Sequence, residues 1–131
     1  MNMYRKVRTT PGPVNDLAAF QALVAAGNFH AMAGTALQPV MDVYECTKKE
    51  AYKEIRQIVC ALTSQHYSRS IIMNNNVPAD EYGIVIEEIG WYVKLQVNLD
   101  DGEAEVCSCH PPKRDMMTKG GLIPASDPNG R

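Results

Sequence analysis

The fold is decided by the stretch Trp91-Tyr92-Val93-Lys94-Leu95-Gln96-Val97. Successive side chains of a β-strand point to opposite faces of the sheet, so residues two apart share a face. One face of this stretch is apolar, and it is formed by Trp91, Val93, Leu95 and Val97. The other face carries Tyr92, Lys94 and Gln96. The alternation predicts a strand with one face in the core and the other available to solvent or to chemistry.

The residues after this strand predict a β-hairpin. Residues 98–102 read Asn-Leu-Asp-Asp-Gly, which are turn-forming residues, and residues 103–110 return to an extended pattern. Pro111 and Pro112 then end the second strand, because neither residue has an N–H to donate to a sheet.

Two more extended segments precede the hairpin, at residues 66–72 and 81–87. Residues 74–78, Asn-Asn-Asn-Val-Pro, form a loop between them, and residues 88–90 turn the chain into the central strand. The four segments together predict a small antiparallel sheet in the C-terminal half of the chain.

Three helices are predicted before the sheet. Asn15 or Asp16 can cap a helix over residues 17–26. A second, short helix covers residues 34–44, with Pro39 in its first turn or at a kink.

The third helix has the clearest pattern. Thr47 and Glu50 have capping-box spacing, and the helix continues to about Ser64. Its apolar residues recur at helical spacing, at Ala51, Ile55, Ile58, Val59 and Leu62. The order of elements predicts an α+β fold, in which N-terminal helices pack on one face of a small C-terminal antiparallel β-sheet.

The chain of 131 residues is long enough for one domain. We expect a flexible basic arm at residues 1–13, a single domain at 14–113 and a flexible tail at 114–131. The arm contains Arg5, Lys6 and Arg8.

The composition is that of an ordinary globular protein, with 45% hydrophobic and 21% charged residues. The sequence has no apolar run of the roughly twenty residues that a membrane-spanning helix needs, and we find no signal-peptide pattern in it. Four cysteines without zinc-type spacing suggest reduced thiols and a cytoplasmic protein. The net charge of -2 provides no general attraction to nucleic acid.

Several short motifs occur in an order that resembles the MqsR family, the toxin halves of type II toxin–antitoxin pairs. These motifs are residues 22–27, 34–37, 66–70, 80–82, 92–95 and 107–110. The resemblance covers about Val14 to Lys113. It implies a RelE/ParE-like fold and an endoribonuclease that cuts messenger RNA without a metal or other cofactor. A cognate antitoxin protein would hold this toxin inactive.

The resemblance also implies site residues. Tyr92 stands where the family has its active-site tyrosine, and Lys94 stands at a matching lysine. Asp80 and Tyr82 match a further family segment, but Ala79 occupies its functional glutamine position.

Two active lysines of the family are replaced in this chain. One position holds Ser68, with Arg69 beside it, and the last one holds His110. These changes leave the activity open, and a non-catalytic protein-binding module of the same fold is the alternative.

The remaining groups could still cut RNA by attack of the 2′-hydroxyl on the adjacent phosphorus. His110 could act as acid or base, because an imidazole exchanges protons near neutral pH. Arg69 or Lys94 could stabilise phosphate charge, and Tyr92 could orient a phosphate oxygen or stack on a base. Further substrate-binding residues are expected at Tyr67, Ser68, Tyr82 and Lys113.

Each of these residues also has a purely structural interpretation. Arg69 could pair across the sheet with Glu81 or Glu87. Tyr92 could simply pack against a neighbouring strand. Lys94 could be a solvated charge at a sheet edge, and His110 could be a surface residue at the end of its strand.

Cys107, Cys109 and His110 invite a metal site or a Cys/His nucleophile. However, a Cys-x-Cys sequence on a strand lacks the loop that zinc knuckles use, and no further residue supports a dyad. Neither site is expected.

Overall fold

The structure is a computed structural model that describes residues 7–97 and 102–126. Within these ranges the chain forms three α-helices and a mostly antiparallel sheet, which confirms the predicted α+β class. Along the chain the elements are β1 (Thr9–Thr10), α1 (Leu17–Ala25), β2 (Phe29–Ala31), the π-helical turn η1 (Ala33–Leu37), α2 (Gln38–Tyr44), α3 (Lys48–Ala61), the 3-10 turn η2 (Ser64–His66), β3 (Tyr67–Ile72), β4 (Pro78–Ile86), β5 (Ile89–Val97), β6 (Ala104–His110), β7 (Met116–Thr118) and β8 (Gly121–Ile123).

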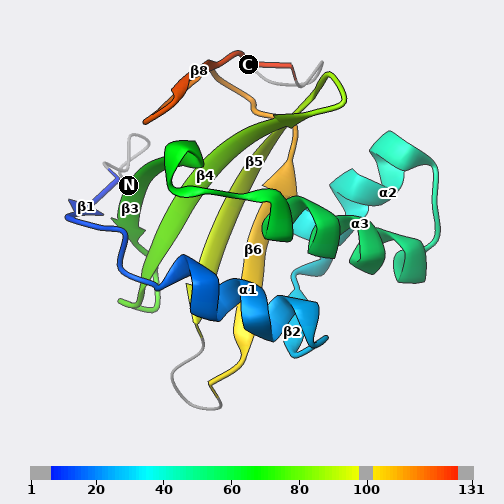
Figure 1. Ribbon diagram of the computed structural model, residues 1–131, viewed down its shortest axis with the longest axis horizontal. Helices are drawn as coiled ribbons and strands as arrows, with labels where there is room; N and C mark the ends of the chain where they lie inside the picture. Colours follow the sequence, from blue (N-terminus) through cyan, green and yellow to red (C-terminus); the bar gives the residue numbers. More distant parts are fainter. Residues whose placement is uncertain (1–6, 98–101, 127–131) are drawn as a thin grey trace, which may run out of the picture.

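The main sheet has the strand order β1-β3-β4-β5-β6-β2. All neighbouring pairs are antiparallel except β2 and β6, which run parallel. Figure 1 shows α1 and α3 crossing one face of this sheet. Strands β7 and β8 form a separate two-stranded sheet, which contacts β3 and β4.

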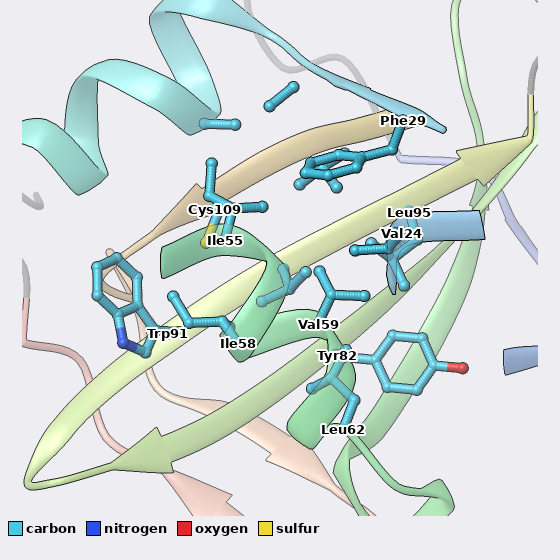
Figure 2. Packing of buried hydrophobic residues seen from close by; sticks show 14 of the residues in the cluster. Val24, Phe29, Ile55, Ile58, Val59, Leu62, Tyr82, Trp91, Leu95 and Cys109 are labelled. Carbon is cyan, nitrogen blue, oxygen red and sulfur yellow. The ribbon is translucent and has the colours of Figure 1, made fainter. Parts of the chain in front are cut away.

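The alternation in β5 sorts its side chains as predicted. Trp91, Val93 and Leu95 are buried against the helices, whereas Tyr92 and Lys94 lie on the opposite face and are partly exposed. The end of the strand departs from the prediction: Gln96 is buried, with its amide donating to the Val77 carbonyl at 3.0 Å, and Val97 is only partly buried. Figure 2 shows residues of α3, such as Ile58 and Val59, among the buried side chains of the sheet. We call the face of the sheet opposite the helices the open face.

The helix caps predicted from the sequence form in the structure. The Asp16 carboxylate accepts a hydrogen bond from the Ala19 amide at 3.1 Å and caps α1. Thr47 and Glu50 form both hydrogen bonds of a capping box at the start of α3. Pro39 lies in the first turn of α2, where its missing N–H costs little. No helix in the described ranges is long and apolar enough to cross a membrane.

The turn between β4 and β5 lies one residue earlier than predicted. Ile86 pairs with Ile89, so the turn consists of Glu87 and Glu88, both at positive φ. Of the predicted turn at 98–102, only Gly102 lies within the described residues, and it has a φ of 67°.

The two segments predicted to be flexible contain regular structure, which corrects the sequence analysis. In the arm, Thr9 and Thr10 pair with β3, and the Arg8 guanidinium donates to the Asn76 side chain at 3.1 Å. In the tail, β7 and β8 form a hairpin. Arg5 and Lys6 lie outside the described residues, as do residues 127–131.

Candidate functional site

The strand register brings the four predicted catalytic residues to the open face of the sheet. Tyr92 of β5 lies directly opposite His110 of β6. One row along, Arg69 of β3 lies opposite Glu81 of β4, which in turn lies opposite Lys94 of β5. Because side chains two apart on a strand share a face, both rows project to the same side of the sheet.

Glu81 links two of the predicted groups. One of its carboxylate oxygens, Oε1, accepts from Arg69 Nε at 2.6 Å, and the other, Oε2, accepts from the Tyr92 hydroxyl at 2.5 Å. The Glu81 side chain is only 7% exposed, whereas the Arg69 side chain is 48% exposed. The pairing of Arg69 with Glu81, considered as a structural alternative, is therefore present.

Tyr92 is held as a neutral phenol. Burial raises its pKa far above the ordinary value, and the neighbouring Glu81 charge raises it further. Tyr92 is consequently a hydrogen-bond donor to Glu81 and not a phenolate at physiological pH.

His110 contacts the same phenol from the next strand. Its ring centroid lies 4.9 Å from that of Tyr92, at an interplanar angle of 37°. Its Nδ1 lies 2.8 Å from the Pro111 carbonyl oxygen, which fixes Nδ1 as the nitrogen that carries a proton. The proline that ends β6 thus also orients the imidazole.

These groups line a pocket of about 650 Å³ on the open face. Arg69, Glu81, Tyr92 and His110 come from the sheet, and residues 112–117 supply a second side. We call residues 112–117 the C-terminal wall. The volume is in the usual range for small-molecule and nucleotide sites.

Gly83 lets the C-terminal hairpin approach the sheet. A Cβ at this position would lie 2.8 Å from the Met116 sulfur and 3.1 Å from Ile123 Cγ1, closer than side chains normally approach. The Ser68 hydroxyl also donates to the Met117 carbonyl at 2.7 Å and fastens the C-terminal wall to β3.

The predicted cationic side chains differ in whether they reach the pocket. Lys113 lines the pocket and is exposed, as is its neighbour Arg114. Lys94 is on the same face of the sheet but does not line the pocket. Arg69 and Lys113 are therefore the predicted cations best placed to meet a ligand there.

Tyr67 and Tyr82 do not join the site, which corrects their assignment as substrate-binding residues. They are 8% and 1% exposed, and their rings pack edge to face at 5.7 Å in the core. A β-bulge between Tyr67 and Arg69 turns these two side chains to opposite faces. Ser68 lines the pocket, but its hydroxyl donates a hydrogen bond to the Met117 carbonyl of the C-terminal wall.

The cysteines of β6 are buried and protonated. Burial raises the pKa of Cys107 to about 11 and raises that of Cys109 further. A Cys/His nucleophile is thus disfavoured. In the described part of the chain, no three His, Cys, Asp or Glu side chains are grouped as a metal site.

Sequence reasoning missed two parts of the site. Glu81 was considered only as an ion-pair partner of Arg69, although a glutamate facing the same side as Tyr92 is a signal that strand alternation carries. The C-terminal wall has no such signal, because its residues lack a repeating pattern.

Comparisons with family models and with curated proteins give no match for this chain.

Proposed function

We propose that this protein is a metal-independent endoribonuclease that acts as the toxin of a type II toxin–antitoxin pair, as its resemblance to the MqsR family implies. The single observation that carries the proposal is the convergence of Arg69, Tyr92 and His110 on one pocket of the open face. Arg69 comes from β3, Tyr92 from β5 and His110 from β6, and β4, which carries Glu81, lies between the first two strands.

The proposed reaction is attack of a ribose 2′-hydroxyl on the adjacent phosphorus. His110 donates a proton to the departing 5′-oxygen, and the Arg69 guanidinium stabilises the negative charge of the phosphorane. Lys113, on the pocket rim, holds a neighbouring phosphate. The products are a 2′,3′-cyclic phosphate and a 5′-hydroxyl.

The fold supports this proposal at a coarser level. Helices on one face of a mostly antiparallel sheet leave part of the other face, beside the C-terminal wall, for a ligand, and this is the arrangement we expect of a RelE/ParE-like protein. In the proposed pair, an antitoxin protein would neutralise the toxin, and messenger RNA would be the substrate.

The test uses the purified chain and single-stranded RNA in the presence of EDTA. We expect cleavage to a 2′,3′-cyclic phosphate, and no cleavage of the same sequence with 2′-O-methyl riboses. His110→Ala should lower the rate about 100-fold or more, since general acid catalysis typically contributes that much. His30→Ala, on the exposed side of β2, is the matched control and should cleave normally. Intact RNA after incubation with folded wild-type protein would rule the proposal out.

A protein-binding module without nuclease activity is the second candidate. Two observations favour it: Arg69 is already paired with Glu81, and Ser68 occupies an active lysine position of the MqsR family. Growth arrest on induction that disappears in His110→Ala, while binding to the partner persists, would exclude this candidate.

A further inference from the structure

The hydroxyl hydrogen of Tyr92 points to Glu81, so it is not available to donate a hydrogen bond to a phosphate ligand. Its oxygen lies 2.5 Å from Glu81 Oε2, and an ionised carboxylate can only accept. A phenol has one hydrogen, so Tyr92 can offer only acceptor lone pairs to a ligand in the pocket. An acceptor is suited to a hydroxyl group and unsuited to a phosphate oxygen.

Glu81 is built to receive a proton. It is 5% exposed, and both of its oxygens are used, one by Tyr92 and the other by Arg69. The guanidinium offsets the cost of a buried negative charge while its own side chain stays about half exposed at the pocket.

From this geometry we propose that Glu81 is the final acceptor of the proton from the 2′-hydroxyl and that Tyr92 passes the proton on. The inference rests on the proposed ribonuclease function. As the O2′–P bond forms, the O2′–H bond breaks and its proton moves to the Tyr92 oxygen. The original Tyr92 proton moves to Glu81 Oε2. The P–O5′ bond breaks at the same phosphorus, and O5′ takes its proton from His110.

The same transfer makes Arg69 more effective. Protonated Glu81 is neutral and no longer balances the guanidinium, so the positive charge of Arg69 becomes available as negative charge develops on the phosphorane. Protonation of Glu81 thereby couples the removal of the 2′-hydroxyl proton to the stabilisation of the negative charge on the phosphorane. This role needs no direct contact between Glu81 and the substrate, so Glu81 is a positioning and proton-accepting residue that acts through Tyr92.

The deciding variant is Glu81→Gln, which keeps the size of the side chain. A glutamine that turns its oxygen to Arg69 turns its NH2 group to Tyr92, so the phenol can no longer donate in that direction. We expect kcat to fall about 100-fold or more with little change in KM. A fall in kcat at an unchanged KM marks the loss of a proton-transfer step, because a loss of substrate binding would raise KM.

Two further variants complete the experiment. Tyr92→Phe should lower kcat by a similar factor with little change in KM, and the double variant should be no slower than either single one, because both act in one relay. Glu105→Gln is the matched control on the open face of β6, outside the pocket, and should keep the wild-type kcat and KM.

The outcomes separate the inference from the function beneath it. Wild-type protein that cleaves RNA together with a folded Glu81→Gln variant that keeps the wild-type kcat would overturn the relay alone. Failure of the wild type to cleave RNA would overturn both. If Glu81→Gln does not fold by circular dichroism, Tyr92→Phe decides: a fall in kcat with an unchanged KM supports the relay, and a wild-type kcat overturns it.

Discussion

Asp80 is a buried carboxylate that ties the start of the domain to the sheet. It accepts from the Val14 and Asn15 amides, each at 2.9 Å, and from the Ser70 hydroxyl at 2.5 Å. We expect Asp80→Ala to lower the free energy of unfolding by about 2–3 kcal/mol, because the donors lose their acceptor inside the protein. Urea unfolding measures the change. Asp42→Ala, at an exposed site on α2, is the control, and an equal loss in both variants would contradict the anchoring role.

Single residues also show where sequence reasoning on the site succeeds and fails. Strict alternation in β5 placed Tyr92 and Trp91 on their correct faces, whereas Arg69 and His110 reach the face of Tyr92 through strand pairings that contain register shifts. Tyr67 was misplaced because one extra residue at the β-bulge reverses the alternation. A bulge depends on the pairing of two strands, so the sequence of one strand does not reveal it.

At the scale of elements, the C-terminal hairpin is joined by hydrogen bonds to β3 and to the turn before it, and Met116 and Ile123 lie over Gly83 of β4. The Ser68 hydroxyl donates to Met117, and the Lys119 and Gly120 amides donate to the carbonyls of Tyr67 and Gln65. Removing the first bond with Ser68→Ala should lower the opening free energy of the hairpin by about 1 kcal/mol, and amide exchange in β7 and β8 should accelerate about fivefold.

Hydrogen exchange read residue by residue is the measurement for this change. Global stability should stay close to that of the wild type, since the core lies on the other face of the sheet. Ser64→Ala, on the exposed turn before β3, is the control and should leave exchange in the hairpin unchanged. Equal acceleration throughout the protein would show that the hairpin does not open separately.

The predicted elements divide by the origin of their stability. Helices α1 and α3 carry their own caps and apolar spacing, and the pair β5–β6 carries its alternation, so all were predictable. Strands β1, β7 and β8 have two or three residues each and form through contacts with the rest of the fold. Gly83 makes room for the hairpin, but a glycine in a strand does not indicate which segment will occupy that room.

At the scale of the whole molecule, charge is distributed unevenly although the net charge is only -2. Lys113 and Arg114 are exposed beside the pocket and Arg69 lies within it. If Lys113 contacts a phosphate, Lys113→Ala should reduce the slope of log binding constant against log salt by about 0.7, the value for one contact to a single strand. Fluorescence anisotropy with labelled RNA at several salt concentrations measures the slope.

The matched control is Lys53→Ala, since Lys53 is an exposed lysine on α3 on the other side of the sheet. This variant should keep the wild-type slope. Equal slopes for wild type and Lys113→Ala would place the bound phosphates elsewhere.

The parallel pairing of β2 with β6 has a consequence for how the chain folds. Phe29 and Ala31 find their partners Ala104 and Val106 about seventy-five positions further along the chain. The loop between such partners must close before the pairing contributes any stability, and folds dominated by distant contacts cross a higher entropic barrier. A fragment that stops before β6 lacks the partner of β2, so it cannot form the parallel pair that closes this edge of the sheet.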